Sequence, residues 1–311
     1  MKILFMGTPD FALFTLRALY EAGEDVVGVV TQPDKPKGRG YALVPPPVKV
    51  FALEKNIPVF QPATLKNHAF DDTLSALSPD VIVVAAYGKI LPEEVLCFPP
   101  YGALNVHGSL LPAYRGAAPM QRAILNGEKT TGITVMQMDA GLDTGDMLLS
   151  ESIEIGKNDD FETVHDKLGA LGAKLMLTAL KKLREGALVP VKQDASKATY
   201  AAKIEKEDCQ IVFAESAAKV HDRVRALSPV PLAFTHTPDG KLLKVVKSRV
   251  STVPVPKDAA PGCVIALSDA VTVACGKGAI DLLRVLPEGK GKMDAADYIR
   301  GRRLFVGDML S

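Results

Sequence analysis

The amino-acid sequence predicts an α/β domain with a doubly wound, mainly parallel sheet, followed by a small β-barrel of the OB type. In the first half of the chain, short apolar runs alternate with helical patterns, as in α/β proteins. Residues 81–86 form an unbroken run of Val, Ile and Ala, as expected of a strand buried on both faces. After Gly186, Pro and Gly separate several short strand patterns, which favours a barrel. The length of 311 residues also favours two domains.

Each element of the first half follows from its own periodicity. The predicted strands, which together form a parallel core, are residues 2–6, 25–31, 57–60, 79–86, 102–107 and 131–138. The predicted helices are residues 10–23, 47–56 and 159–186. We expect Asp10 to cap the first of these helices and Gly186 to end the last one.

The second half contains shorter elements. The predicted strands are residues 242–250, 262–267, 270–275 and 279–286, and the predicted helices are residues 215–227 and 294–304. The stretch before them is polar and basic with little periodicity, so we interpret it as a linker. The chain is therefore divided into an N-terminal domain at 1–188, a linker at 189–207 and a C-terminal domain at 208–311.

Composition and charge narrow the class of protein. With 37 Lys and Arg against 36 Asp and Glu, the net charge is +1, so any surface that binds nucleic acid must be local. The apolar runs are too short to span a membrane and the N-terminus lacks signal-peptide features, so we expect a cytoplasmic protein without a membrane partner. The cysteines show no CxxC spacing and the histidines lack mutual ligand spacing, so neither disulfides nor a metal site is predicted.

Three polar residues are expected to meet at the carboxyl edge of the predicted sheet. Asn105 and His107 are two positions apart at the end of a strand, so their side chains share one face. Asp143 lies in the Gly- and Asp-rich loop at 138–147, which follows another strand and reaches the same edge. A carboxamide, an imidazole and a carboxylate are thereby predicted to lie together.

These groups suit acyl transfer without a covalent intermediate. Asn105 offers a neutral N–H donor to a developing oxyanion, while His107 moves a proton and Asp143 fixes its ring. Ser109 lacks the G-x-S-x-G turn of a serine hydrolase, so we do not expect it to attack. Purely structural roles remain open at this stage: a turn cap for Asn105, a core position for His107 and an Asx-turn for Asp143.

Two spaced motifs resemble the folate-dependent formyltransferases. They are NVHGSLLPAYRGAAP at 105–119 and GITVMQMDAGLDTGDML at 132–148, in which Asn105, His107 and Asp143 look like the family's catalytic residues. The segments MGTPDFA, PDKPKGRG and AAYGKILP also look like that family, and the resemblance extends over nearly the whole chain. It implies a Rossmann-like formyltransferase N-terminal domain followed by an OB-like β-barrel C-terminal domain that binds tRNA.

The resemblance further implies the substrates. The expected formyl donor is 10-formyltetrahydrofolate, and no metal is expected to take part. The expected acceptor is the amino group of methionine on initiator tRNA. The protein is expected to be a monomer. The residues expected to bind folate are Ser109, Leu110, Leu111, Pro112, Tyr87, Gly88, Ile90, Asp139 and Gly141. A cis bond is expected between Leu111 and Pro112.

A long insertion at 31–49 follows the second predicted strand and is rich in Pro, Gly, Lys and Arg. Loops of this length are often functional, and Gly on both sides of Arg39 allows the backbone to come close to RNA. Together with the basic linker, the insertion supplies the residues expected to bind tRNA, which are Lys35, Lys37, Arg39, Lys203 and Lys206. Lys49 is expected to add to the basic character of the insertion.

Other functions are less consistent with the sequence. A formyltransferase that acts on glycinamide ribonucleotide would need a Gly- and Asn-rich phosphate loop after its first strand, which GTPDFA does not supply. An amino-sugar formyltransferase stays open, because its substrate pocket leaves no clear pattern. A non-catalytic RNA-binding protein would not need Asn105, His107 and Asp143 together. A nicotinamide oxidoreductase would need a glycine fingerprint that is missing here.

Overall fold

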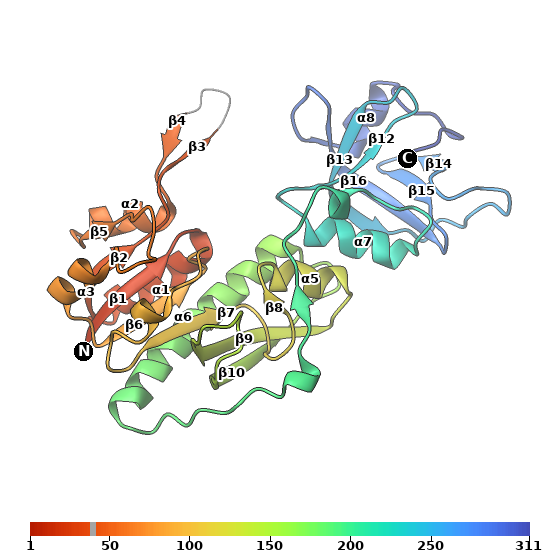
Figure 1. Cartoon of the computed structure of the whole chain (residues 1–311). Helices are drawn as coiled ribbons and strands as arrows, with labels where there is room; N and C mark the ends of the chain where they lie inside the picture. The colour runs from red at the N-terminus through yellow and green to blue at the C-terminus, as the bar shows by residue number, and fades with distance from the viewer. Residues whose placement is uncertain (38–41) are drawn as a thin grey trace. The chain divides into compact units, whose positions relative to one another are not determined.

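The computed structural model describes residues 1–37 and 42–311 (Figure 1). The chain forms two compact units, each built from three stretches of sequence. The first unit comprises residues 1–116, 131–153 and 165–200, and the second comprises residues 117–130, 154–164 and 201–311. The short helix at 119–125 thus belongs to the second unit, although it precedes strands of the first.

A seven-stranded sheet forms the centre of the first unit, in the order β10-β9-β7-β6-β1-β2-β5. From β7 to β5 the neighbouring strands are parallel. The strands are β1 (Lys2–Gly7), β2 (Asp25–Val30), β5 (Val59–Phe60), β6 (Val81–Ala85), β7 (Ala103–His107), β9 (Thr130–Gln137) and β10 (Met147–Glu154). The order reverses between β1 and β6, which is the point where open α/β sheets bind ligands at the carboxyl ends of their strands.

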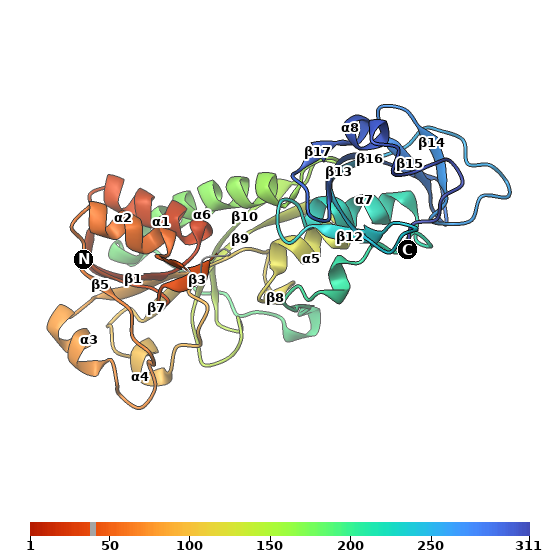
Figure 2. The same ribbon diagram turned by 90° about the horizontal axis from the view of Figure 1, so that it is seen from above.

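Helices cover both faces of this sheet, as a doubly wound fold requires. Figure 2 shows α1, α2 and α6 on one face and α3 and α4 on the other. These helices are α1 (Asp10–Glu21), α2 (Pro47–Glu54), α3 (Asp71–Leu77), α4 (Glu93–Leu96) and α6 (Phe161–Arg184). Alternate residues of β1 and β6, among them Leu4, Met6, Ile82 and Val84, pack on the α3 and α4 side. The predicted α/β class of this half is therefore confirmed.

Two expectations for the first unit were wrong, and β10, α3 and α4 were not predicted. Asp10 is the first residue of α1 rather than its cap: Pro9 holds the cap position with an extended backbone, and no side chain caps the helix. The core is not entirely parallel, because β9 runs antiparallel to β7, with His107 opposite Thr134. An apolar strand buried on both faces has the same pattern in either direction, so its sequence does not reveal its direction. Gly186 does follow the end of α6, with a φ of 64°.

An antiparallel sheet forms the centre of the second unit. Its strands are β12 (Ala233–His236), β13 (Leu242–Val250), β14 (Val264–Leu267), β15 (Val271–Ala274), β16 (Ala279–Pro287) and β17 (Met293–Asp294). The sheet order is β12-β13-β16-β15-β14, and β17 pairs with β16. The helices are α5 (Pro119–Leu125), α7 (Ala217–Ala226) and α8 (Ala295–Arg300), and α5 packs on α7. The short strands predicted after Gly186 are thus confirmed as an antiparallel sheet.

The insertion after β2, which we call the arm, contains two short paired strands. Its two strands, β3 (Lys35–Lys37) and β4 (Ala42–Val44), pair antiparallel and project from the sheet of the first unit (Figure 1). We call residues 31–37 and 42–49 the arm base. Arg39, with Gly38 and Gly40, lies outside the described residues.

The remaining short elements lie between the larger ones. They are β8 (Arg115–Gly116), β11 (Tyr200–Ala201) and the 3₁₀ turns Ala195–Lys197 and Glu207–Cys209. Within residues 1–37 and 42–311, no helix combines the length and apolar character needed to cross a membrane. The four cysteines are free, and Cys97 is exposed.

Candidate active site

His107 is the last residue of β7, and Asn105 lies two positions before it. Because side chains alternate along a strand, both face the same side of the sheet. His107 is 5% exposed, and Asn105 is partly exposed. In the backbone pairing with β9, Asn105 lies opposite Met136 and His107 lies opposite Thr134. The Asn105 side chain makes no hydrogen bond within the part of the chain that the structure describes. Its N–H groups are therefore available to a substrate.

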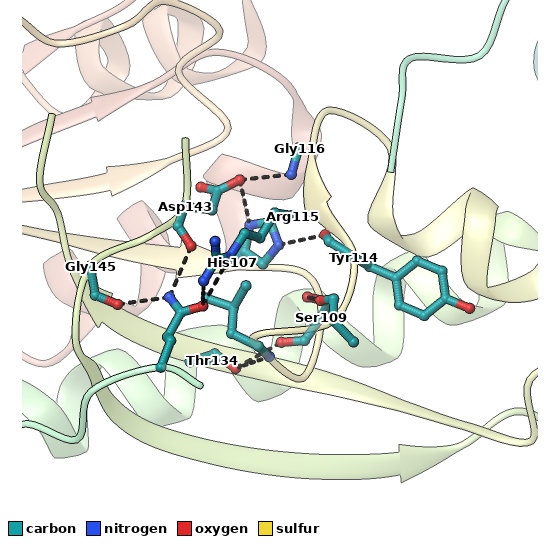
Figure 3. A network of polar contacts seen from close by, with 11 residues as sticks. His107, Ser109, Tyr114, Arg115, Gly116, Thr134, Asp143 and Gly145 are labelled. Carbon is teal, nitrogen blue, oxygen red and sulfur yellow. Dashed lines mark hydrogen bonds and ion pairs between the residues drawn. The ribbon is translucent and has the colours of Figure 1, made fainter. Parts of the chain in front are cut away.

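Both ring nitrogens of His107 face an oxygen atom (Figure 3). Nε2 lies 3.0 Å from the carbonyl oxygen of Tyr114. Because a carbonyl can only accept, Nε2 carries the hydrogen of this bond. Nδ1 lies 3.6 Å from Oδ2 of Asp143, which is an ion-pair distance rather than a hydrogen bond. Nδ1 is thus the ring atom that can take up a further proton, next to a carboxylate.

Asp143 reaches His107 from the loop that follows β9. Its backbone has a φ of 52°, in the left-handed region that Asp tolerates better than most residues. Its Oδ2 also accepts the N–H of Gly116 at 2.8 Å. The same carboxylate oxygen therefore contacts the His107 ring and a turn near the end of the first motif. The structure brings Asn105, His107 and Asp143 to one edge of the sheet, as the sequence predicts.

The turn after His107 is fixed by Ser109 and Thr134. The Ser109 hydroxyl donates to the carbonyl oxygen of Ala113 at 2.6 Å, and the Thr134 hydroxyl donates to the carbonyl oxygen of Ser109 at 2.8 Å. The N–H of Leu111 in turn donates to Oγ1 of Thr134 at 3.0 Å. The bond between Leu111 and Pro112 is cis, as predicted. With its hydroxyl bonded within the turn, Ser109 has a structural role here and no base activates it.

The turn after β6 lies at the point where the strand order reverses. The Tyr87 carbonyl oxygen accepts from Oγ1 of Thr8 at 3.0 Å and from Nε2 of Gln32 at 3.2 Å, so this turn is tied to the ends of β1 and β2. The Tyr87 side chain points into the core, where burial raises the pKa of its phenol to about 12. Gly88 has a φ of 83°, and the Ile90 side chain is 77% exposed.

The loop at 139–143 supports its own conformation. Oδ1 of Asp139 accepts from the N–H of Gly141 at 3.1 Å and from the hydroxyl of Thr144 at 2.7 Å. Asp139 and Gly141 are exposed, and the Leu142 side chain is 57% exposed. Two exposed apolar side chains, Ile90 and Leu142, therefore belong to the two loops that were expected to contact folate.

Sequence reasoning missed two residues of this network, Arg115 and Gln193. Arg115 is 5% exposed, and its Nε and Nη2 donate to Oε1 of Gln193 at 3.1 and 2.7 Å. Nε2 of Gln193 donates to the carbonyl oxygens of Asp143 and Gly145 at 2.8 and 2.7 Å. Gln193 lies in the stretch predicted as a linker, and no local pattern there distinguishes it from an exposed polar residue.

Family models match both parts of the chain. The model described as formyl transferase matches residues 1–180, and the model described as formyl transferase, C-terminal domain, matches residues 203–303. The chain belongs to the formyl transferase family. The resemblance inferred from the two motifs is thereby confirmed.

A full-length relative agrees with this membership, and solved structures share the fold. The chain is 50% identical over 311 residues to a methionyl-tRNA formyltransferase of Caldanaerobacter subterraneus subsp. tengcongensis, with 100% of both chains covered. Its fold is similar to that of a methionyl-tRNA formyltransferase from Clostridium thermocellum, with a TM-score of 0.56, 18% identity and coverage of 82% of this chain and 96% of the other. It is also similar to HypX from Aquifex aeolicus in complex with tetrahydrofolic acid, with a TM-score of 0.65, 19% identity and coverage of 96% and 47%.

The basic residues expected to bind tRNA fall into two groups. Lys35 is exposed on β3, whereas the Lys37 side chain and Arg39 lie outside what the structure describes. Lys203 and Lys206 are exposed in the second unit, and Nζ of Lys203 lies 3.8 Å from Oε1 of Glu205. The structure does not bring these two groups together within one unit.

Lys49 does not add to the exposed basic surface. Its Nζ lies 2.9 and 2.8 Å from the two carboxylate oxygens of Asp34 and 2.8 Å from Oε1 of Gln61. The bonds from Lys49, together with one that Nε2 of Gln61 donates to Oδ1 of Asp34 at 2.8 Å, hold the pKa of Asp34 below its usual value. Lys49 therefore links Asp34 of the arm base to Gln61, which follows β5. Among the described residues, no group of His, Cys, Asp and Glu could hold a metal ion.

Proposed function

We propose that this chain transfers a formyl group from 10-formyltetrahydrofolate to the amino group of methionine on initiator methionyl-tRNA. The observation that carries the proposal is the 50% identity to a methionyl-tRNA formyltransferase over the full length of both chains. The fold alone does not select this acceptor, since a sugar 3N-formyltransferase has a similar fold with a TM-score of 0.65 and coverage of 94% and 99%. Full-length identity at this level favours the tRNA acceptor over a small amine.

In the proposed reaction, Asn105 and His107 act on the group being transferred. The acceptor nitrogen forms a bond to the formyl carbon, the bond from that carbon to the folate nitrogen breaks, and one proton passes from the acceptor to the folate. Asn105, whose amide has no partner among the described residues, donates an N–H to the oxyanion that develops on the formyl oxygen. His107 takes up the proton at Nδ1, directly or through a water, because Nε2 already carries a hydrogen.

Asp143 and the turn at 108–116 prepare His107 for this role. A proton on Nδ1 converts the 3.6 Å approach to Asp143 into a contact between opposite charges. The carbonyl oxygen of Tyr114 prevents the ring from rotating, since it holds Nε2. No covalent enzyme intermediate is needed, which agrees with the internal bond of the Ser109 hydroxyl.

Folate is proposed to bind at the carboxyl edge of the sheet, between the turn after β6 and the loop after β9. Ile90 and Leu142 offer exposed apolar side chains to the aromatic pteridine. Tyr87 contributes through its backbone, because its side chain belongs to the core. The proposed binding residues are Ser109, Leu110, Leu111, Pro112, Tyr87, Gly88, Ile90, Asp139 and Gly141.

The acceptor tRNA is proposed to use the insertion and the C-terminal domain. Lys35, Lys37 and Arg39 would contact its acceptor end, and Lys203 and Lys206 would contact phosphates. The domain boundaries proposed for this division are 1–188, 189–207 and 208–311. The protein is proposed to act in the cytoplasm, since its acceptor is a substrate of translation. It is also proposed to act as a monomer.

A transfer assay with competing acceptors tests the proposal. The full chain is incubated with 10-formyltetrahydrofolate labelled in the formyl group, together with charged initiator tRNA, charged elongator tRNA, glycinamide ribonucleotide and an amino-sugar nucleotide. We expect the label on methionine of the initiator tRNA, and labelling slowed about 100-fold or more with the His107→Ala variant. Preferential labelling of either small amine would contradict the proposed acceptor.

A further inference from the structure

One short segment contacts both chain segments that hold His107. We call residues 193–199 the clamp segment; it lies in the stretch interpreted from the sequence as a linker. All of it belongs to the first unit, as do Tyr114 and Asp143, whose oxygen atoms face the two ring nitrogens. Figure 3 shows the network around the ring. Support for both sides of the ring therefore comes from one place.

The Gln193 side chain spans the Asp143 side. Its amide nitrogen donates to two carbonyl oxygens, of Asp143 and Gly145, and its amide oxygen accepts twice from Arg115. Carbonyls only accept and a guanidinium only donates, so the amide has one orientation that satisfies all four bonds. Glutamate would lose both donors, and methionine would lose all four bonds. An amide of this length is the group that these neighbours require.

Thr199 supports the Tyr114 side. Its hydroxyl accepts the N–H of Tyr114 at 2.8 Å, and its carbonyl oxygen accepts the N–H of Arg115 at 2.8 Å. The N–H of Thr199 donates to the carbonyl oxygen of Pro112 at 3.3 Å. The turn that carries the Tyr114 carbonyl oxygen is thus bonded to the same segment that holds the loop of Asp143.

We propose that Gln193 is a positioning residue for formyl transfer, acting through Asp143. By holding the carbonyl oxygens of Asp143 and Gly145, it keeps the backbone of Asp143 in its left-handed conformation and the carboxylate beside Nδ1 of His107. Arg115 in turn holds the amide in its orientation. The inference rests on the proposed function for its rate measurements, but its geometric claim does not depend on the acceptor.

Kinetics of Gln193→Met and Gln193→Glu test the rate effect. Both variants remove the donors to the loop, and Gln193→Glu retains a partner for Arg115. We expect kcat to fall about 10- to 100-fold in each, the scale of a small misplacement at a reacting group, with the folate KM within about threefold of wild type. Lys192→Met, at the exposed neighbouring position, is the matched control and should keep the wild-type kcat. An unchanged kcat in Gln193→Glu would overturn the proposal.

A double-mutant cycle with Asp143→Asn separates positioning from general stabilisation. If Gln193 acts through Asp143, adding Gln193→Met to Asp143→Asn lowers kcat by less than about threefold further. Fully additive losses would mean that Gln193 supports the fold and not Asp143, and would overturn the proposal.

Ring ¹⁵N resonances test the geometry without any substrate. In Gln193→Met and Gln193→Glu, the His107 resonances are expected to move toward those of Asp143→Asn, while those of His221 in the second unit stay unchanged. His107 resonances identical to wild type would overturn the proposal. Failure of the wild-type protein to formylate methionyl-tRNA would instead contradict the proposed function, and the resonance test would still decide the role of Gln193.

Discussion

Two buried histidines, one in each unit, have closely similar surroundings. His107 and His221 are 5% and 7% exposed. Each has Nε2 at a main-chain carbonyl oxygen, that of Tyr114 at 3.0 Å and that of Lys157 at 3.1 Å. His221 is well described as a structural histidine, that is, a core residue whose ring nitrogens both have hydrogen-bond partners. Burial and hydrogen bonding at Nε2 therefore do not distinguish a catalytic histidine from a structural one.

The difference lies at Nδ1 and in what stands next to the ring. Nδ1 of His221 lies 2.9 Å from the Ser248 hydroxyl, which can donate to a neutral ring. Nδ1 of His107 instead faces the carboxylate of Asp143, and the unbonded amide of Asn105 lies two residues away on the same strand face. A carboxylate stabilises a ring that takes up a proton, whereas a hydroxyl fixes the neutral form. The partner at Nδ1 is thus the difference that favours the proposed proton transfer at His107 and not at His221.

The largest effect is expected from removing the side chains at the proposed reaction centre. His107→Ala and Asn105→Ala should each lower kcat by about 100-fold or more, the scale of one lost oxyanion donor. His221→Gln, in the other unit, should leave kcat unchanged because it contacts no part of the site. Formyl transfer to charged initiator tRNA measures both. Equal losses in His107→Ala and His221→Gln would remove the distinction drawn between the two residues.

Exchanging the partner at Nδ1 should give the next largest effect. Asp143→Asn can still accept the Gly116 N–H through its amide oxygen but cannot offset a charge on His107, so we expect kcat to fall about 10- to 100-fold with the fold intact. Ser248→Ala removes the corresponding bond of His221 and should cost about 1 kcal/mol of unfolding free energy without a change in kcat. Kinetics and urea unfolding of both variants test the comparison, and a catalytic defect in Ser248→Ala would contradict it.

A smaller effect should follow from loosening the arm base, which neither histidine contacts. Lys49→Met leaves Asp34 and Gln61 without their shared partner. We expect kcat/KM for charged initiator tRNA to fall on the order of fivefold, a modest loss typical of a partly exposed ion pair, with the folate KM unchanged. Lys66→Met, at an exposed position of the same unit, serves as the control. A fall in kcat/KM of similar size in Lys66→Met would assign the effect to charge alone.

The smallest effect is a pH dependence of stability at His221. Burial lowers the pKa of its imidazole below the ordinary 6.5, and the positive charge of Arg225 lowers this pKa further. The hydrogen bond to the Lys157 carbonyl and the negative charge of Asp222 act in the opposite direction but are outweighed. Below pH 6.5 the unfolded chain binds a proton that the folded ring resists, so stability falls as the pH falls below that value. We expect His221→Gln to reduce the drop in Tm between pH 7.5 and 5.5 by about 2–4 °C. An identical drop in both proteins would show that His221 does not remain neutral in the fold.

The sequence by itself determined the α/β class, the carboxyl ends of the strands that were predicted, and the grouping of Asn105, His107 and Asp143. The reason is local: side chains alternate along a strand, and the carboxyl ends of strands in an α/β sheet provide the ligand edge. The cis bond at Leu111 and the short strands after Gly186 followed from the family resemblance and from turn residues.

Only the tertiary structure decided the direction of β9 and the contacts that hold the site. Gln193 bonds to carbonyl oxygens 50 and 48 positions earlier in the chain, and Arg115 bonds to Gln193 across 78 positions. Periodicity records which face a residue takes within its own element, but not which distant segment packs against it. The linker pattern is therefore the same whether Gln193 faces solvent or two carbonyl oxygens, because a polar side chain satisfies either environment.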